Sequence, residues 1–202
     1  MPRPNQLLAN RRLKNKTSSM KRLFFFLSLL SGAAACAQQP ASGNDIKKFI
    51  PAGYEVRDSV SGDLNGDNIP DLVLVLQQKT PASDTADRPL LLLLGDSHHH
   101  WALAARNKDL IYPADIGGTQ GDPYVQTTID HGCVTIEQYY GSRERTRSVV
   151  TFCYQPKIKD WILQQVAITH EDALHADAAK TTIKKGKQLK PISIRRYAGE
   201  YE

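Results

Sequence analysis

Residues 63–76 read Asp-Leu-Asn-Gly-Asp-Asn-Ile-Pro-Asp-Leu-Val-Leu-Val-Leu, so that a polar loop runs directly into an apolar segment. A hard cation such as Ca²⁺ binds about six to eight oxygens, and alternate residues of a tightly curled loop can direct their oxygens to one point. Oxygen-bearing side chains occupy loop positions 1, 3, 5 and 9, and a backbone carbonyl would supply position 7: Asp63, Asn65, Asp67, Asp71 and the carbonyl of Ile69. The spacing therefore predicts a calcium site.

The end of this loop indicates which kind of structure follows it. In an EF-hand, position 12 is a bidentate Glu and the chain continues as a helix. Here position 12 is Leu74, inside a β-branched and apolar run over residues 71–76 that predicts a buried strand. Gly66 lies between two ligands, where a sharp bend favours a positive φ. The loop is therefore expected to lead into a β-sheet.

Residues 61–75 resemble the calcium-binding turn of FG-GAP and VCBS-type repeats, with the core Asp-x-Asn-x-Asp-x-x-x-Asp. In those families the loop joins strands of a propeller blade and is usually structural. The resemblance implies a β-rich, exported bacterial protein and does not imply an activity. The three carboxylates and the missing twelfth ligand favour a modest affinity, suited to calcium levels outside the cytoplasm.

The rest of the chain extends this β interpretation. Strand-like segments separated by turn residues predict a first antiparallel unit at 54–62, 71–78, 90–94 and 100–105. A second unit is expected at 125–130, 133–140, 147–154 and 161–168. Trp101 and Trp161, in the last strand of each, favour loose repeats of one unit. The predicted fold class is mainly β: two antiparallel four-stranded propeller-blade-like units with one or two short helices.

Three shorter elements complete the prediction. A helical turn is expected at 45–50, where Pro51 stops it. A short helix is expected at 171–179, after Thr169 as N-cap, and one more hairpin at 181–194.

The cysteines fix a register for the second unit. When Cys133 faces Cys153, the apolar pairs Val134–Phe152 and Ile136–Val150 fall together on one face of the hairpin. A shift by one residue would spoil both matches. Because an exported protein meets an oxidising compartment, we expect a Cys133–Cys153 disulfide.

The N-terminus predicts export. Lys21-Arg22 precedes the apolar run 23–30 and the small residues 31–35, which is typical of a signal peptide and too short to span a bilayer. We expect a signal peptide at 1–36 with a true start at Met20, a flexible linker at 37–44 and a single β-rich domain at 45–202.

Cys36 has two interpretations. The favoured one is a lipobox cysteine, acylated and left as the first mature residue, which would tether the protein to a membrane by an N-terminal lipid anchor. In the other, Ala35-Cys36-Ala37 is a cleavage site before Gln38, and the mature protein is soluble. The expected location is periplasmic or, as a lipoprotein, the outer membrane.

The net charge of +5 comes from the part of the chain that export removes. Seven basic residues and no acidic ones precede Cys36; without them, 19 of the 26 basic residues remain against 21 acidic ones. The mature chain is therefore slightly acidic, which excludes an argument for nucleic-acid binding from the high isoelectric point.

Two further segments are candidates for binding. The histidines 98–100 have the side chains of a transition-metal site, although a solvated turn is the favoured interpretation. The glycine-rich loop 117–123 is the best candidate binding surface, together with four residues of the following hairpin: Tyr139, Tyr140, Arg143 and Arg145. A tight connection and a charged hairpin tip are nevertheless the favoured interpretation of these residues.

The leading functional hypothesis is an exported, calcium-stabilised and non-enzymatic module of the cell envelope that binds a protein or a glycan. The sequence contains no Gly-x-Ser-x-Gly and no His-Glu-x-x-His motif. One alternative is an envelope hydrolase that uses acids and histidines near residues 96–122, with Asp96, His98 and Asp122 in one pocket. The other is an inhibitor or immunity-type protein that acts through the 141–147 hairpin.

Overall fold

A computed structural model describes residues 46–80 and 86–199, apart from the side chain of Ala176. The predicted signal peptide, the predicted linker and the predicted acylation site Cys36 lie outside the described residues. In the described part of the chain, no helix is long and apolar enough to cross a membrane.

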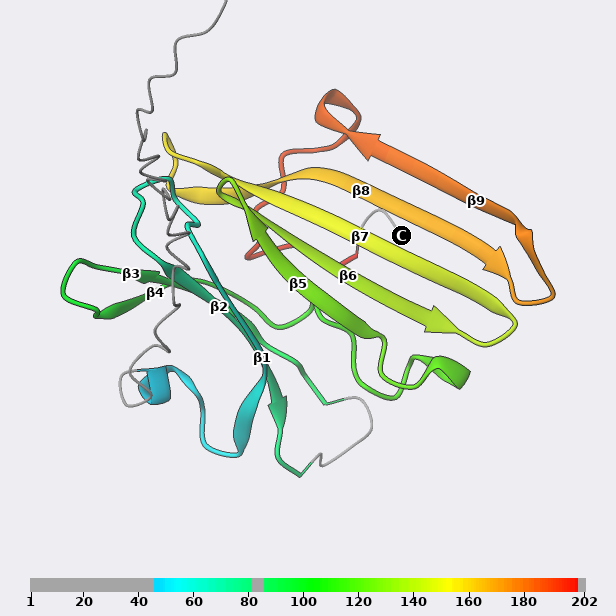
Figure 1. Ribbon diagram of the computed structural model, residues 1–202, viewed down its shortest axis with the longest axis horizontal. Coiled ribbons are helices and arrows are strands. Elements are labelled where there is room, and N and C mark those ends of the chain that lie inside the picture. The colour runs from blue at the N-terminus through cyan, green and yellow to red at the C-terminus, as the bar shows by residue number, and fades with distance from the viewer. Residues whose placement is uncertain (1–45, 81–85, 200–202) are drawn as a thin grey trace, which may run out of the picture. The chain divides into compact units, whose positions relative to one another are not determined.

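The chain is mainly β, as predicted, and forms two antiparallel sheets (Figure 1). The first sheet has the order β1-β2-β3-β4 and contains the four strands expected from the sequence. These strands are β1 (Tyr54–Gly62), β2 (Asp71–Gln78), β3 (Leu90–Gly95) and β4 (Trp101–Asn107). The helical content of the described residues consists of three short 3₁₀ turns: η1 (Ile46–Phe49), η2 (Gly118–Gln120) and η3 (Gly186–Gln188).

The second sheet has five strands, one more than predicted, in the order β5-β6-β7-β8-β9. They are β5 (Tyr124–Asp130), β6 (Cys133–Gly141), β7 (Glu144–Gln155), β8 (Asp160–Asp172) and β9 (His175–Lys185). The predicted helix at 171–179 is wrong, because this segment closes the β8–β9 hairpin. The predicted hairpin at 181–194 is also wrong: residues 181–185 pair with residues 165–169 in the middle of β8, and Ser193 bridges Ile162 near the start of that strand.

The described residues form neither a closed barrel nor a propeller. The two tryptophans also occupy different environments. Trp161 is buried in the larger core cluster, whereas Trp101 is only partly buried and packs on the smaller cluster. The comparison with propeller blades therefore stays a prediction.

The first sheet is apolar on both faces. One face contributes Val73, Val75, Leu90 and Leu92 to a cluster that also contains Val134, Ile136, Val150 and Phe152 of the second sheet. The opposite face forms a second cluster, which consists of Leu72, Leu74, Leu76, Leu91 and Leu93. Residues of η1 pack against this cluster. Burial on both faces explains why β2 and β3 are continuous apolar runs and lack a polar alternation.

The predicted register of the second sheet is confirmed. Cys133 faces Cys153, Val134 faces Phe152 and Ile136 faces Val150. The two cysteines form a disulfide across a Cα–Cα distance of 4.0 Å, close to that of a non-hydrogen-bonded antiparallel pair.

The C-terminal segment connects the two sheets. The backbone N–H of Ile194 donates to the carbonyl of Trp161 at 2.8 Å, which attaches the segment to β8. The amide of Asn107, at the end of β4, donates to the carbonyl of Tyr197 at 2.8 Å. The side chain of Arg195 also donates to the carbonyl of Ala104.

Candidate metal centre

The candidate calcium loop connects β1 to β2 and curls around the carboxylate of Asp63. This carboxylate accepts backbone N–H bonds from Asn65 at 3.1 Å, Gly66 at 2.7 Å and Asn68 at 2.9 Å. Gly66 and Asn68 have φ values of 82° and 62°, so the sharp bend expected at the glycine is present. Burial opposes ionisation of Asp63, but the N–H donors outweigh it and hold its pKa below the ordinary value.

The next two predicted ligands continue the same pattern. The side-chain oxygen of Asn65 accepts the N–H of Asp67 at 3.0 Å, and the carboxylate of Asp67 accepts the N–H of Ile69 at 2.8 Å. The amide nitrogen of Asn65 also donates to Asp67 at 2.9 Å. Alternate side chains thus fold back over the loop and accept its backbone N–H groups.

Asp71 differs from the other predicted ligands because its side chain is fully buried. One carboxylate oxygen accepts the N–H of Leu64 at 2.7 Å, and the other accepts the N–H of Gly95 at 2.9 Å. Burial and the nearby charges of Asp67 and Asp63 raise the pKa of Asp71, whereas the two N–H bonds lower it. The net result is a pKa of about 6. The three carboxylates are therefore close enough to repel one another.

Two contacts fix the loop to the rest of the fold. Leu64, the second loop residue, is fully buried, and its carbonyl accepts a hydrogen bond from Trp161 Nε1 at 3.1 Å. On the other side, a Cβ at Gly95 would lie 2.4 Å from the carbonyl oxygen of Pro70. The loop is therefore held between the second sheet and the end of β3.

The donor set of the loop fits a hard cation chemically, because it consists only of carboxylate, amide and carbonyl oxygens. Residues 46–80 and 86–199 contain no group of at least three His, Cys, Asp or Glu side chains that is already arranged as a metal site. Binding would need the Asn65–Asp67 side-chain bond to open, so that both oxygens turn to the cation. Asp71 would contribute the electron pairs that its two N–H bonds leave free.

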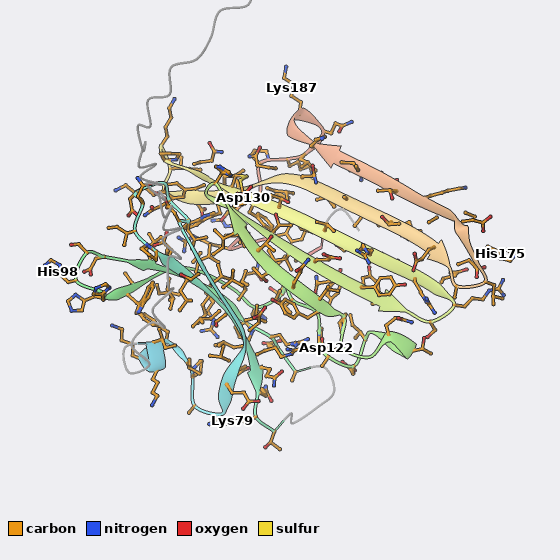
Figure 2. All side chains as sticks on the ribbon, in the orientation of Figure 1. Lys79, His98, Asp122, Asp130, His175 and Lys187 are labelled. Atoms are coloured by element: carbon orange, nitrogen blue, oxygen red, sulfur yellow. A yellow bond between two sulfur atoms is a disulfide. The ribbon has the colours of Figure 1, made fainter. Side chains whose placement is uncertain are left out.

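The residues of the hydrolase hypothesis do not come together. Asp96 and His98 lie in the turn that follows β3, whereas Asp122 pairs with Arg88, which precedes β3. Six residues of strand span about 20 Å, and Figure 2 shows His98 far from Asp122.

The structure brings only part of the second candidate surface together. The loop 117–123 packs on the β6–β7 hairpin, where the N–H of Gly141 donates to the carbonyl of Gly117 at 3.1 Å. Tyr139 and Tyr140 point to opposite faces of β6, and Tyr140 packs edge-on against Tyr112.

The two arginines of that surface already have partners. Arg143 pairs with Asp172 at 3.1 Å, and Arg145 donates to the carbonyl of Ser142 at 3.0 Å. Tyr139 donates a hydrogen bond to Glu171. The charge of Arg143 is therefore balanced by a carboxylate, whereas Arg145 donates to uncharged oxygens.

One polar cluster was not expected from the sequence. The guanidinium of Arg88 is 2% exposed, binds the carboxylate of Asp122 at 2.9 Å and donates to the carbonyl of Tyr112. The guanidinium groups of Arg57 and Arg88 each lie 5.8 Å from the ring of Tyr124, whose hydroxyl donates to Asp58 at 2.6 Å. Burial and the Asp58 carboxylate raise the pKa of Tyr124. The cluster joins β1 and the segment before β3 to the start of β5, and no local sequence pattern predicts it.

The chain matches no family model, no curated protein and no solved structure.

Proposed function

We propose that this protein is an exported β-domain stabilised by calcium, and that it serves as a non-enzymatic binding or structural module of the cell envelope. The cation would be held by Asp63, Asn65, Asp67, the carbonyl of Ile69 and Asp71. Its partner would be an envelope protein or a glycan. The signal-like N-terminus and the Cys133–Cys153 disulfide support an oxidising compartment.

The observation that carries the proposal is the position of Asp71. Its buried carboxylate joins the N–H of Leu64 in the loop to the N–H of Gly95 at the end of β3. A cation bound between this carboxylate, Asp63 and Asp67 would cancel their repulsion and stiffen the connection. Binding to the folded state alone stabilises it by about 2.7 kcal/mol at a hundredfold excess over Kd.

Thermal melting of the full chain in millimolar CaCl₂ and in EGTA tests the proposal. Calcium should raise the melting temperature of the wild type and leave that of Asp67→Ala unchanged. Asp115→Ala is the matched control, because Asp115 is an exposed carboxylate outside the loop. Equal melting of the wild type with and without calcium would refute the role of the cation.

The tether is a separate part of the proposal. Acylation of Cys36 would hold the domain at the membrane through residues 37–44, in the periplasm or at the outer membrane. Metabolic labelling with a fatty acid, in the wild type and in Cys36→Ser, tests this step. Label that persists in Cys36→Ser would exclude this cysteine as the acceptor.

A further inference from the structure

The turn between β3 and β4 holds two histidine rings on one side of the chain. The rings of His98 and His100 stack with their centroids 6.1 Å apart and their planes at 23°. Neighbouring residues of a regular strand point to opposite faces, whereas residues two positions apart point to the same face. His99, which lies between His98 and His100, adopts a φ of 62°. The turn therefore aligns the first and third histidines.

The carboxylate of Asp96 organises this turn. One oxygen accepts the backbone N–H groups of His98 at 2.8 Å and His100 at 2.9 Å. The other oxygen lies 3.2 Å from Nδ1 of His100. A carboxylate is a hydrogen-bond acceptor, so in this contact Nδ1–H of His100 is the donor.

This contact determines which ring nitrogen of His100 carries a lone pair. A carboxylate that accepts from Nδ1–H fixes the imidazole tautomer and leaves Nε2 as the electron donor, as in the second shell of many metal sites. Nδ1 of His98 lies 3.4 Å from the hydroxyl of Ser97, which can accept in the same way. When Nδ1–H is the donor in both contacts, the two rings offer Nε2 to solvent at the exposed tip of the hairpin.

We propose that His98 and His100 form a two-histidine chelate for a borderline transition-metal dication such as Zn²⁺ or Cu²⁺, with Asp96 as the positioning residue. Imidazole nitrogen suits these metals and does not suit calcium. A tetrahedral zinc with Zn–N bonds of about 2.0–2.1 Å needs the two nitrogens about 3.4 Å apart. Rotation of the two exposed rings toward each other would reach this separation, and water would complete the coordination. In Figure 2 the turn that carries His98 projects away from the rest of the sheet.

Calorimetric titration of the untagged full chain with ZnCl₂ tests this site. The chain carries Cys36→Ser, so that its thiol does not compete, and millimolar CaCl₂ is present throughout. His98→Ala and His100→Ala should each weaken binding about a hundredfold, because each removes one arm of the chelate. Asp96→Asn should weaken binding about tenfold through the tautomer of His100.

His99→Ala is the matched control and should bind zinc as the wild type does. Absence of zinc binding to the wild type would overturn the proposal, and so would an equal loss in His99→Ala. Nitrogen chemical shifts of the imidazole rings supply a second measurement, in which zinc should move Nε2 of His98 and His100 first. Because excess calcium is always present, failure here leaves the calcium proposal untouched.

Discussion

The indole Nε1 of Trp161 donates a hydrogen bond at 3.1 Å to the backbone carbonyl of Leu64, and the two residues are 97 positions apart in the chain. Trp161 lies in β8 of the second sheet, and Leu64 lies in the candidate calcium loop between β1 and β2 of the first sheet. Both side chains are buried in the same cluster. This single bond therefore connects the order of the loop to the packing between the sheets.

Trp161→Phe should lower the free energy of unfolding by about 2–4 kcal/mol, because it leaves a cavity and a buried carbonyl without its donor. Trp101→Phe is the matched control and should cost less, since Trp101 is only partly buried. Urea denaturation of both variants measures the difference. Equal losses would mean that the bond to Leu64 contributes nothing.

Asp122→Asn should destabilise the protein by about 2–4 kcal/mol, because it leaves the guanidinium of Arg88 buried without its counter-ion. The neighbouring carboxylate Asp115 is exposed, so Asp115→Asn should have almost no effect. Denaturant unfolding at neutral pH compares the two variants. A loss in Asp122→Asn no larger than that of the control would contradict the role of the pair.

Asp122 should also contribute to the pH dependence of stability. Burial opposes its ionisation, but the bond to Arg88 outweighs burial and holds the pKa of Asp122 below its ordinary value. Its contribution is therefore complete above the unfolded pKa of about 3.9 and is lost as the pH falls through the lower folded value. Between neutral pH and about pH 3, the wild type should lose more stability than Asp122→Asn. Parallel losses would contradict this.

The sequence predicts those parts of the fold where several local signals agree. In the β6–β7 hairpin, apolar pairs such as Ile136–Val150 and the facing cysteines Cys133 and Cys153 select the same register. The strands β2 and β3 are equally clear, because residues buried on both faces form uninterrupted apolar runs.

Prediction from the sequence fails where a long-range contact determines the local structure. The alanine-rich segment 171–179 has a helical preference, but pairing with β8 prevails, and the hydroxyls of Thr169 and Thr181 meet at 2.8 Å across the ladder. The candidate loop shows the same limit. Its spacing identifies the oxygen donors, but the burial of Asp71 depends on Gly95, which lies 24 positions away.

Gly95→Ala should destabilise the protein by about 1–3 kcal/mol, because the added methyl group would lie 2.4 Å from the carbonyl oxygen of Pro70. The displacement should also weaken the bond from the Gly95 N–H to Asp71. Gly53→Ala is the control: this glycine has a φ of 84° but no atom near an added Cβ, so its cost of about 1 kcal/mol is backbone strain alone. Urea unfolding should give Gly95→Ala a lower free energy of unfolding than Gly53→Ala, and the reverse order would refute the steric argument.

Replacement of both Cys133 and Cys153 by Ala should leave the fold intact and lower the free energy of unfolding by about 3 kcal/mol. The disulfide closes a segment with a sequence separation of 20, and its loss returns the corresponding entropy to the unfolded chain. The register survives because the apolar pairs beside the cysteines remain. Reductant should destabilise the wild type by a similar amount and leave the double variant unchanged. A double variant that fails to fold would show that the disulfide, and not the apolar pairing, selects the register.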